Sequence, residues 1–413
     1  MLGAALRDGS GDRRCVFEVF TRRLPEGRRY AVVAGTSRVL AAIADFRFDG
    51  ATVQWLRSCS IVDDAAAAYL ADYRFEGDVD GYPEGELYFP YSPILTVSGT
   101  FAQAVILETL VLSILNHDSA IAAAAARMVT AAAGRPIIEM GSRRTHEQAA
   151  VAAARAAYLA GFESTSNLAA ALQFGIPTAG TAAHAFTLLH DDERAAFQAQ
   201  VQSQGPGTTL LVDTYDITRG IELAVEVAGA GLGAIRIDSG DLAVHASQAR
   251  AQLDALGATD TRIVVSGDLD EFAIAALAVA PIDAYGAGTA VVTGSGAPTA
   301  GMIYKLVEVD GRPVAKRSEH KQSVGGRKTA VRSHKPTGTA VEEIIVSGPV
   351  SSLGDGERLL QRPMLRGGQP VADPPGLAEA RAHLRAATVT LPWDGLKLSR
   401  GEPAISTRLI AGR

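Results

Sequence analysis

Cysteine, lysine and long uninterrupted apolar runs are all scarce in this chain of 413 residues. Its two cysteines, Cys15 and Cys59, are too few for a disulfide framework or a cysteine metal cluster, and they favour a reducing cytoplasm. No lysine precedes Lys305, so most of the chain lacks the Schiff-base nucleophile of a barrel aldolase. The alanine-rich run over 120–133 contains Arg127 and is predicted to be too short to cross a membrane.

The chain also lacks a strong charge of either sign. A net charge of −6, with 20% charged residues, argues against binding to nucleic acid or to an anionic membrane. The opening residues Met1–Arg7 show no apolar leader, and the histidines show no metal-ligand spacing. We therefore expect a soluble cytoplasmic protein with no nucleic-acid or membrane partner, divided into two or three domains.

From residue 136 onward, apolar strand-like runs alternate with helix-like runs, a pattern typical of a parallel sheet. The expected strands lie at 137–140, 209–212, 234–237, 263–265 and 284–285. The expected helices lie at 146–159, 166–174, 185–200, 217–227, 242–256 and 269–279. The pattern favours an α/β fold.

The flanking segments follow a different rhythm. Before residue 136, strands are expected at 16–22 and 30–34 and helices at 102–115 and 119–133. After residue 301, a hairpin is expected at 302–315 around Asp310-Gly311, then a strand at 344–346 and a helix at 377–387. The basic strip Lys316–Arg332 is interpreted as a solvated strand face rather than a second nucleotide site.

The most informative loop follows the apolar run 232–235. Arg236 suits an anion, and Asp238 suits ribose hydroxyls or a metal-bridged phosphate. Gly240 would let a ligand approach the backbone closely. A salt bridge beside a helix cap is the alternative interpretation of this loop.

Two further loops follow apolar strands. One carries Gly267 and Asp268, and the other carries Gly288 and Thr289, where bare backbone N–H groups and a hydroxyl suit a phosphate. Because strand ends in an α/β barrel meet at one rim, these loops indicate a single ligand with several polar parts.

Three more positions carry candidate chemistry. Arg143 and Arg144 lie on a strand-to-helix loop and suit a carboxylate or phosphate, or form a solvated basic turn. His184, among small residues at a helix start, suits a base or phosphoryl acceptor, or is structural. Asp213 would orient His184 or cap the helix near Ile217.

Together and in this order, these segments resemble the nicotinate phosphoribosyltransferases, whose wider family includes the nicotinamide and quinolinate enzymes. The resemblance runs from about residue 16 to residue 332. It rests on Val16–Arg29, Gly141–Thr145, Gly161–Asn167, Phe174–Pro177, Gly180–His184, Asp213–Asp216, Arg236–Asp241 and Tyr285–Gly294.

The resemblance implies an irregular α/β barrel over 116–301. An amino-terminal α/β sandwich domain (1–115) is completed by carboxy-terminal strands from 302–413. It also implies a homodimer that joins nicotinate to phosphoribosyl pyrophosphate, giving nicotinate mononucleotide and pyrophosphate. ATP drives the reaction through a phosphohistidine, and Mg²⁺ accompanies the phosphates.

The resemblance also assigns roles to residues of this chain. His184 matches the phosphorylated histidine, with Asp213 as its orienting partner. Thr181 and Arg236 match nicotinate ligands, and Arg143 and Arg144 carboxylate or phosphate ligands. Further matches are Asp238, Gly267 and Asp268 for ribose, Gly288 and Thr289 for its 5-phosphate, and Ser166 for a site hydroxyl or a helix cap.

The absence of one carboxylate near Thr181 indicates which base is bound. The nicotinamide enzyme carries an aspartate in the region between Phe174 and His184, where this chain has no carboxylate. An aspartate would repel the carboxylate of nicotinate, whereas a hydroxyl such as that of Thr181 can donate a hydrogen bond to it. Nicotinate is therefore favoured as the base. A phosphoribosyltransferase for nicotinamide or quinolinate is the alternative.

Two departures from the family pattern stand out. Relatives begin with a segment whose tyrosine reaches the pyridine ring of the neighbouring subunit, and Met1 falls where that segment ends. Ala185 follows His184 where relatives often have serine. The first departure motivates a third alternative, a weakly active ligand-binding homologue that lacks the amino-terminal segment.

Overall fold

The computed structural model describes residues 1–316 and 324–411. The chain divides into two compact units, which are described separately. Unit 1 comprises residues 1–120 and 299–413, and unit 2 comprises residues 121–298. The division at residue 120 falls inside helix α6 (Glu108–Ala132).

Unit 2 is built on six parallel strands. They are β6 (Ile137–Glu139), β7 (Ser164–Thr165), β8 (Thr209–Leu211), β9 (Ala234–Ile237), β10 (Arg262–Gly267) and β11 (Ala284–Ala287). Their order is β7-β6-β11-β10-β9-β8, so β6, the first strand of the unit, pairs with β11, the last. Strands β7 and β8 form the two edges of this sheet. The prediction of an irregular α/β barrel is confirmed.

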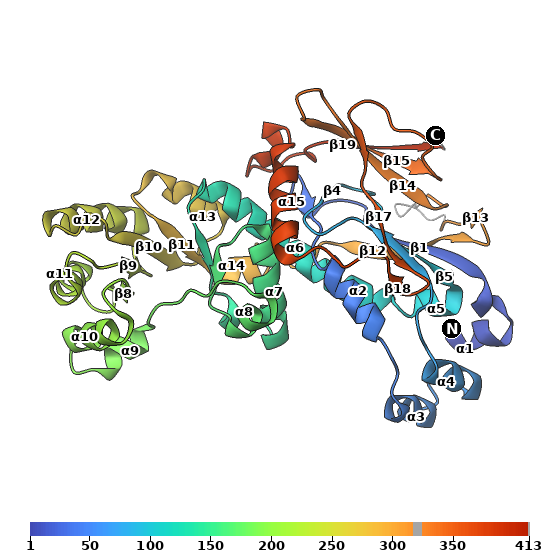
Figure 1. Cartoon of the computed structure of the whole chain (residues 1–413), viewed down its shortest axis with the longest axis horizontal. Coiled ribbons are helices and arrows are strands. Elements are labelled where there is room, and N and C mark those ends of the chain that lie inside the picture. Colours follow the sequence, from blue (N-terminus) through green and yellow to red (C-terminus); the bar gives the residue numbers. More distant parts are fainter. Residues whose placement is uncertain (317–323, 412–413) are drawn as a thin grey trace. The chain divides into compact units, whose positions relative to one another are not determined.

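Helices connect the strands of unit 2. They are α7 (Glu147–Ala160), α8 (Leu168–Phe174), α9 (His184–Leu189), α10 (Glu193–Gln204), α11 (Ile217–Ala228), α12 (Leu242–Ala255), α13 (Glu271–Ala276) and α14 (Thr289–Val292), with 3₁₀ turns at Ser142–Arg144 and Leu277–Val279. Figure 1 shows α10, α11 and α12 on the outer side of β8, β9 and β10.

Helix α11 illustrates how these helices pack. Ile221 and Leu223 are buried, whereas Arg219 forms exposed ion pairs with Glu222 and Glu226 on the opposite face. Gly220 permits the close approach, because a Cβ there would lie 2.4 Å from a backbone oxygen of Val212. Helix and strand therefore meet in direct contact, which fixes the strand end.

Unit 1 contains a seven-stranded sheet of order β13-β12-β1-β5-β3-β17-β18. The strands are β1 (Arg14–Thr21), β3 (Asp78–Gly81), β5 (Leu95–Thr100), β12 (Met302–Val309), β13 (Arg312–Pro313), β17 (Arg362–Arg366) and β18 (Gln369–Pro370). Strand β1 lies between β5 and β12, and β3 lies between β5 and β17. Carboxy-terminal strands thus complete the amino-terminal sheet, as predicted.

The rest of unit 1 contains two smaller sheets and several helices. The sheets have the orders β16-β14-β15-β19 and β2-β4. Their strands are β14 (Lys328–His334), β15 (Ala340–Ser347), β16 (Glu357–Leu359), β19 (Ser406–Ala411), β2 (Ala31–Val32) and β4 (Leu87–Tyr88). The helices are α1 (Leu2–Arg7), α2 (Thr36–Asp45), α3 (Gly50–Ser58), α4 (Asp64–Ala71), α5 (Phe101–Val105) and α15 (Leu377–Val389), with 3₁₀ turns at Ser10–Asp12 and Trp393–Leu396.

Strand β14 overturns the interpretation of the basic strip Lys316–Arg332 as a solvated face, although residues 317–323 of that strip lie outside the described part of the chain. Lys328 donates to Glu18 at 2.7 Å, and both side chains are buried. Arg332, 1% exposed, bonds to Glu86 at 2.5 Å and Glu343 at 2.8 Å. Carboxylates from distant segments neutralise these cations, so no local pattern reveals their burial.

Two helix predictions were also wrong. A single helix, α6, replaces the break expected near residue 116, because Asn116 binds Met302 and Asp118 binds Arg38 instead of capping helices. Within the described residues, α6 is the one helix long and apolar enough for a membrane span, and 61% of its most apolar stretch is buried inside the protein. The helix expected over 185–200 is instead two helices, α9 and α10, because Asp192 caps the second.

Candidate active site

Two adjoining cavities open at the carboxyl ends of strands in unit 2. Compartment A has a volume of about 270 Å³ and compartment B about 250 Å³. Both are lined by Met140, Arg143, Arg236 and Asp238. Compartment A adds Arg144, Ser266, Gly267, Asp268, Gly286, Gly288 and Thr289. Compartment B adds Ser142, Ser166, Gly180, Thr181, Ala182, Ala183, His184 and Leu211.

Arg236 lies where the two compartments meet. It projects from β9 with 11% of its side chain exposed, and each of its guanidinium nitrogens donates a hydrogen bond. The acceptors are the Thr181 hydroxyl at 2.6 Å, the Asp238 carboxylate at 2.8 Å and the Ser266 hydroxyl at 2.7 Å. Three bonds hold the plane of the guanidinium, which suits planar recognition of a carboxylate.

Asp238 remains ionised beside this cation. Burial raises the pKa of Asp238, but hydrogen bonds from Ser266 and Arg236 and the charges of Arg236 and His184 outweigh burial, so the pKa lies below its usual value. The Ser266 hydroxyl donates to the same carboxylate oxygen that Arg236 contacts. The site thus offers a fixed cation next to a fixed anion.

His184 begins α9 and lines compartment B. Its Nε2 lies 3.8 Å from Oδ1 of Asp213 and 3.9 Å from Oδ2 of Asp238, and its Nδ1 lies 3.2 Å from the Thr214 hydroxyl. With 41% of its side chain exposed, the imidazole is accessible to a ligand. Carboxylate oxygens of two aspartates therefore lie within 4 Å of the same ring nitrogen.

Asp213 links His184 to the loop after β9. Its Oδ2 accepts from the Asp238 backbone N–H at 2.8 Å and from the Ser239 hydroxyl at 2.7 Å. Its buried Oδ1 accepts no hydrogen bond from the described part of the chain and is the oxygen that lies 3.8 Å from Nε2 of His184. The alternative that Asp213 caps the helix near Ile217 is wrong, because Asp216 caps α11.

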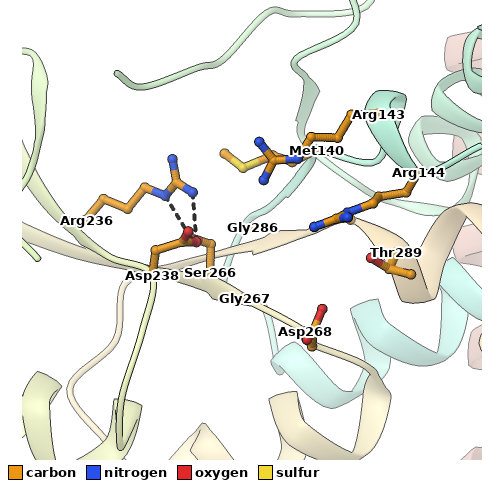
Figure 2. Close-up of a pocket in the computed structure, with 11 residues that line it drawn as sticks. Met140, Arg143, Arg144, Arg236, Asp238, Ser266, Gly267, Asp268, Gly286 and Thr289 are labelled. Atoms are coloured by element: carbon orange, nitrogen blue, oxygen red, sulfur yellow. Dashed lines mark hydrogen bonds and ion pairs between the residues drawn. The ribbon is translucent and has the colours of Figure 1, made fainter. Parts of the chain in front are cut away.

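Arg143 and Arg144 form the 3₁₀ turn after β6. Both line compartment A, and Arg143 also lines compartment B. Figure 2 shows their guanidinium groups pointing into the cavity from the side opposite Arg236 and Asp238. Within the described residues neither arginine forms an ion pair. Two uncompensated cations facing a cavity are suited to a multiply charged anion.

The glycine loops complete compartment A. Gly267 has φ +142°, a backbone conformation that side chains rarely adopt. A Cβ on Gly288 would lie 3.2 Å from the Met140 carbonyl oxygen, so the loop before α14 runs close against the strand-end loop after β6. Thr289 and Asp268 add a hydroxyl and a carboxylate to the lining.

Gly240 lies apart from this lining. Its φ is +79°, and a Cβ there would lie 2.5 Å from Nε2 of His245. The turn and the packing of His245 explain this glycine. Ser166 does line compartment B, and the alternative that it caps the following helix is wrong, because Asn167 caps α8.

Comparison with known proteins identifies the family. Residues 1–116 match the model of the nicotinate phosphoribosyltransferase (NAPRTase) N-terminal domain. The chain is 63% identical to nicotinate phosphoribosyltransferase pncB1 of Mycobacterium tuberculosis, over 99% of this chain and 93% of that relative. The chain belongs to the nicotinate phosphoribosyltransferase family.

More distant relatives and solved structures are also similar to this chain. The human enzyme is 31% identical over 96% of this chain and 84% of its own. The crystal structure of human nicotinic acid phosphoribosyltransferase superposes with a TM-score of 0.86 at 27% identity, covering 100% of this chain and 96% of that one. The Pyrococcus furiosus nicotinate-nucleotide pyrophosphorylase gives a TM-score of 0.77 at 25% identity, covering 94% and 92%. The family resemblance predicted from the motifs is confirmed.

Sequence reasoning missed several lining residues of this family member. Ser266 directly precedes Gly267 and Asp268 in the chain, but its bonds to Arg236 and Asp238 appear only once β9 and β10 are paired. Met140 and Leu211 lie at strand ends, where apolar residues are expected to belong to the hydrophobic core. Both instead line compartment B. An apolar wall beside a guanidinium suits a flat aromatic acid.

Glu193 is a buried carboxyl close to the Asp213 segment and leads to a pH prediction. It is 5% exposed, and among the residues that the structure describes its Oε1 has no hydrogen-bond partner. Burial, followed by the charges of Asp213 and Asp216, raises the pKa of Glu193 to about 7. A raised carboxyl pKa in the folded state means that stability falls as pH rises through about 7.

Glu193→Gln is therefore expected to be more stable than the parent at pH 8, by roughly 1–3 kcal/mol, and to lose this advantage at pH 4. Urea unfolding at the two pH values measures the difference. The control is Glu147→Gln, whose side chain is 81% exposed. An equal stability gain at both pH values would contradict the ionisation argument.

Proposed function

We propose that this chain transfers the phosphoribosyl group of phosphoribosyl pyrophosphate to nicotinate, releasing nicotinate mononucleotide and pyrophosphate, and that ATP drives the transfer through a phosphorylated His184. The observation that carries the proposal is the position of Arg236. It is held by Thr181, Asp238 and Ser266 at the junction of two cavities. Compartment A is lined by both Arg143 and Arg144, and compartment B by His184.

Nicotinate fits compartment B. Its carboxylate would accept from Arg236 and from the hydroxyl of Thr181, which are already 2.6 Å apart. Met140 and Leu211 supply apolar surface for the pyridine ring. The segment that lines this cavity around Thr181 carries no carboxylate, which supports nicotinate over nicotinamide as the base.

Phosphoribosyl pyrophosphate fits compartment A. Arg143 and Arg144 would receive phosphate oxygens, and Gly288 with Thr289 would receive the 5-phosphate. The bond from the sugar C1 to pyrophosphate breaks as the nicotinate nitrogen attacks C1. Positive charge develops on the sugar in that step, and the ionised Asp238 is placed to stabilise it.

Magnesium would enter with the phosphates. Within the described residues no three His, Cys, Asp or Glu side chains form a ligand cluster. One or two carboxylates plus phosphate oxygens are what Mg²⁺ usually takes, and Asp238 and Asp268 in compartment A fit that donor set. When bound, the ion would neutralise the departing pyrophosphate.

ATP coupling would use the accessible imidazole. A nitrogen of His184 accepts the γ-phosphoryl group, ADP leaves, and the displaced proton passes to a neighbouring carboxylate. Asp213 and Asp238, both within 4 Å of Nε2, support this role. Water then hydrolyses the phosphohistidine to phosphate.

A homodimer is part of the same proposal. Leu168 and Leu172 on α8 are 72% and 90% exposed, close in sequence to Ser166 of compartment B, and a second copy would cover such apolar surface. The free thiols of Cys15 and Cys59 support a cytoplasmic location.

The test is to measure nicotinate mononucleotide formation with and without ATP. ATP is expected to stimulate the parent, and His184→Ala is expected to work at the ATP-independent rate in both conditions. Unchanged ATP stimulation in His184→Ala would remove the phosphohistidine. The control is His146→Ala, an exposed histidine at the start of α7.

Two further substrates separate the alternatives. Nicotinamide or quinolinate turning over faster than nicotinate would assign another pyridine base. Nicotinate binding without any product would support the ligand-binding homologue.

A further inference from the structure

Glu139, the last residue of β6, carries a buried carboxyl group. It is 1% exposed, and no ion pair joins it to a described residue of unit 2. The pKa of Glu139 is raised, because burial outweighs the hydrogen bonds from Thr165 and Gly141 that lower it. Burying a carboxyl group that is not paired with a cation lowers the stability of the folded state. The hydrogen bonds of Glu139 therefore indicate its role in the protein.

Those bonds join two loops beside the cavities. Oε1 of Glu139 accepts from the Gly141 backbone N–H, and Oε2 accepts from the Thr165 hydroxyl at 2.5 Å. The Thr165 oxygen accepts in turn from the Asn167 N–H at 2.9 Å, and the Asn167 amide donates to the Ser142 hydroxyl at 2.9 Å. The chain of bonds therefore starts and ends on the loop that follows β6.

The loop held in this way is the one that carries Arg143 and Arg144. The Arg144 N–H donates to the Gly141 carbonyl at 2.8 Å, which closes the turn. Gly141 has no room for a side chain, because a Cβ there would lie 2.1 Å from the Val292 side chain and 3.0 Å from Glu139 Oε1. A small displacement of Gly141 would move both arginines, since they follow it directly in the chain.

We propose that Glu139 is a positioning residue for substrate binding: with Thr165 and Asn167 it fixes the Gly141–Arg144 turn, so that both guanidinium groups face the pyrophosphate of phosphoribosyl pyrophosphate. The proposal rests on the binding role assigned above to Arg143 and Arg144. Glu139 lies outside both cavity linings and acts only through this turn.

A carboxylate at position 139 holds the Gly141–Arg144 turn better than an amide would. Both oxygens of Glu139 accept, one from a backbone N–H and one from a hydroxyl. Glutamine would present an NH₂ group to one of these donors, and aspartate is one methylene too short to reach both. Either change leaves a buried donor without its acceptor.

Glu139→Gln is expected to raise the KM for phosphoribosyl pyrophosphate by about tenfold and to leave the KM for nicotinate within about twofold. The exposed Glu147→Gln is the matched control and is expected to change neither KM. A purely structural role would lower the melting temperature and the active fraction while leaving both KM values alone. Equal KM values for Glu139→Gln and the parent would overturn the proposal.

Thr165 gives an independent test with little change in volume. Thr165→Val removes the hydroxyl and is expected to reproduce the rise in KM for phosphoribosyl pyrophosphate, whereas Thr165→Ser keeps the hydroxyl and is expected to restore the parental value. Parental KM in the valine variant, with the protein folded, would also overturn the proposal.

Arg144→Ala separates this inference from the function it rests on. If Arg144→Ala leaves the KM for phosphoribosyl pyrophosphate unchanged, the proposed binding role of the arginine fails. If Arg144→Ala raises that KM and Glu139→Gln does not, only the positioning role fails. In the double variant the two effects are expected to be less than additive, because both act through one turn.

Discussion

Arg236→Ala is expected to lower kcat/KM for nicotinate by about 10³-fold. The change removes the proposed carboxylate ligand. It also strips hydrogen bonds from three neighbours at once: Asp238, Thr181 and Ser266. Steady-state kinetics with nicotinate varied at saturating phosphoribosyl pyrophosphate measure the loss.

The same variant makes a second prediction, about pH. Because Arg236 helps to hold the pKa of Asp238 below its usual value, its removal is expected to move the acid limb of kcat/KM to higher pH. Arg219→Ala is the control, since that arginine forms only exposed ion pairs with Glu222 and Glu226. A loss of less than tenfold in Arg236→Ala would refute the assignment of Arg236 as the nicotinate ligand.

Arg332→Met is expected to destabilise the protein by about 3–5 kcal/mol without touching the active site. The Arg332 guanidinium is 1% exposed, contacts the carboxylates of Glu86 and Glu343, and donates to the Leu87 carbonyl at 2.6 Å. Methionine fills much of the space, but it leaves Glu343 buried without its cation. Urea unfolding measures the change.

Two further variants test whether the loss of stability comes from the unpaired charge of Glu343. Arg408→Met removes an exposed ion pair with Glu342 and is expected to change stability by no more than about 1 kcal/mol. Adding Glu343→Gln to Arg332→Met is expected to recover part of the loss, because the unpaired charge is then gone. A loss in Arg332→Met as small as that in Arg408→Met would show that water reaches Glu343 in the folded protein.

Most of the site was predictable because it lies at strand ends. Arg236, Asp238, Gly267 and Gly288 each follow or end an apolar run, and parallel strands deliver such residues to one edge. The structure places them around the same two cavities. What the sequence did not reveal was the pairing partner of each residue, such as Ser266 for Arg236.

The features that the sequence did not predict correctly depend on contacts between residues far apart in the chain. Strand β7 has only two residues, too few for any period to show. Asp213 and Asp216 look equally able to cap α11, and only the fold shows that Asp216 does so while Asp213 binds the loop after β9. Hydrogen bonds between distant segments determine the pairing of β7 and the roles of the two aspartates. A local sequence pattern carries no information about such bonds.

The strand order has a consequence for synthesis on the ribosome. Strand β1 lies between β5 and β12, and β6 lies between β7 and β11, so each amino-terminal strand must wait for a partner that is made much later. Until then its open edge can pair with other nascent chains. Folding dominated by such distant contacts is slow, and this chain therefore has a long interval in which a chaperone that shields strand edges would improve its yield.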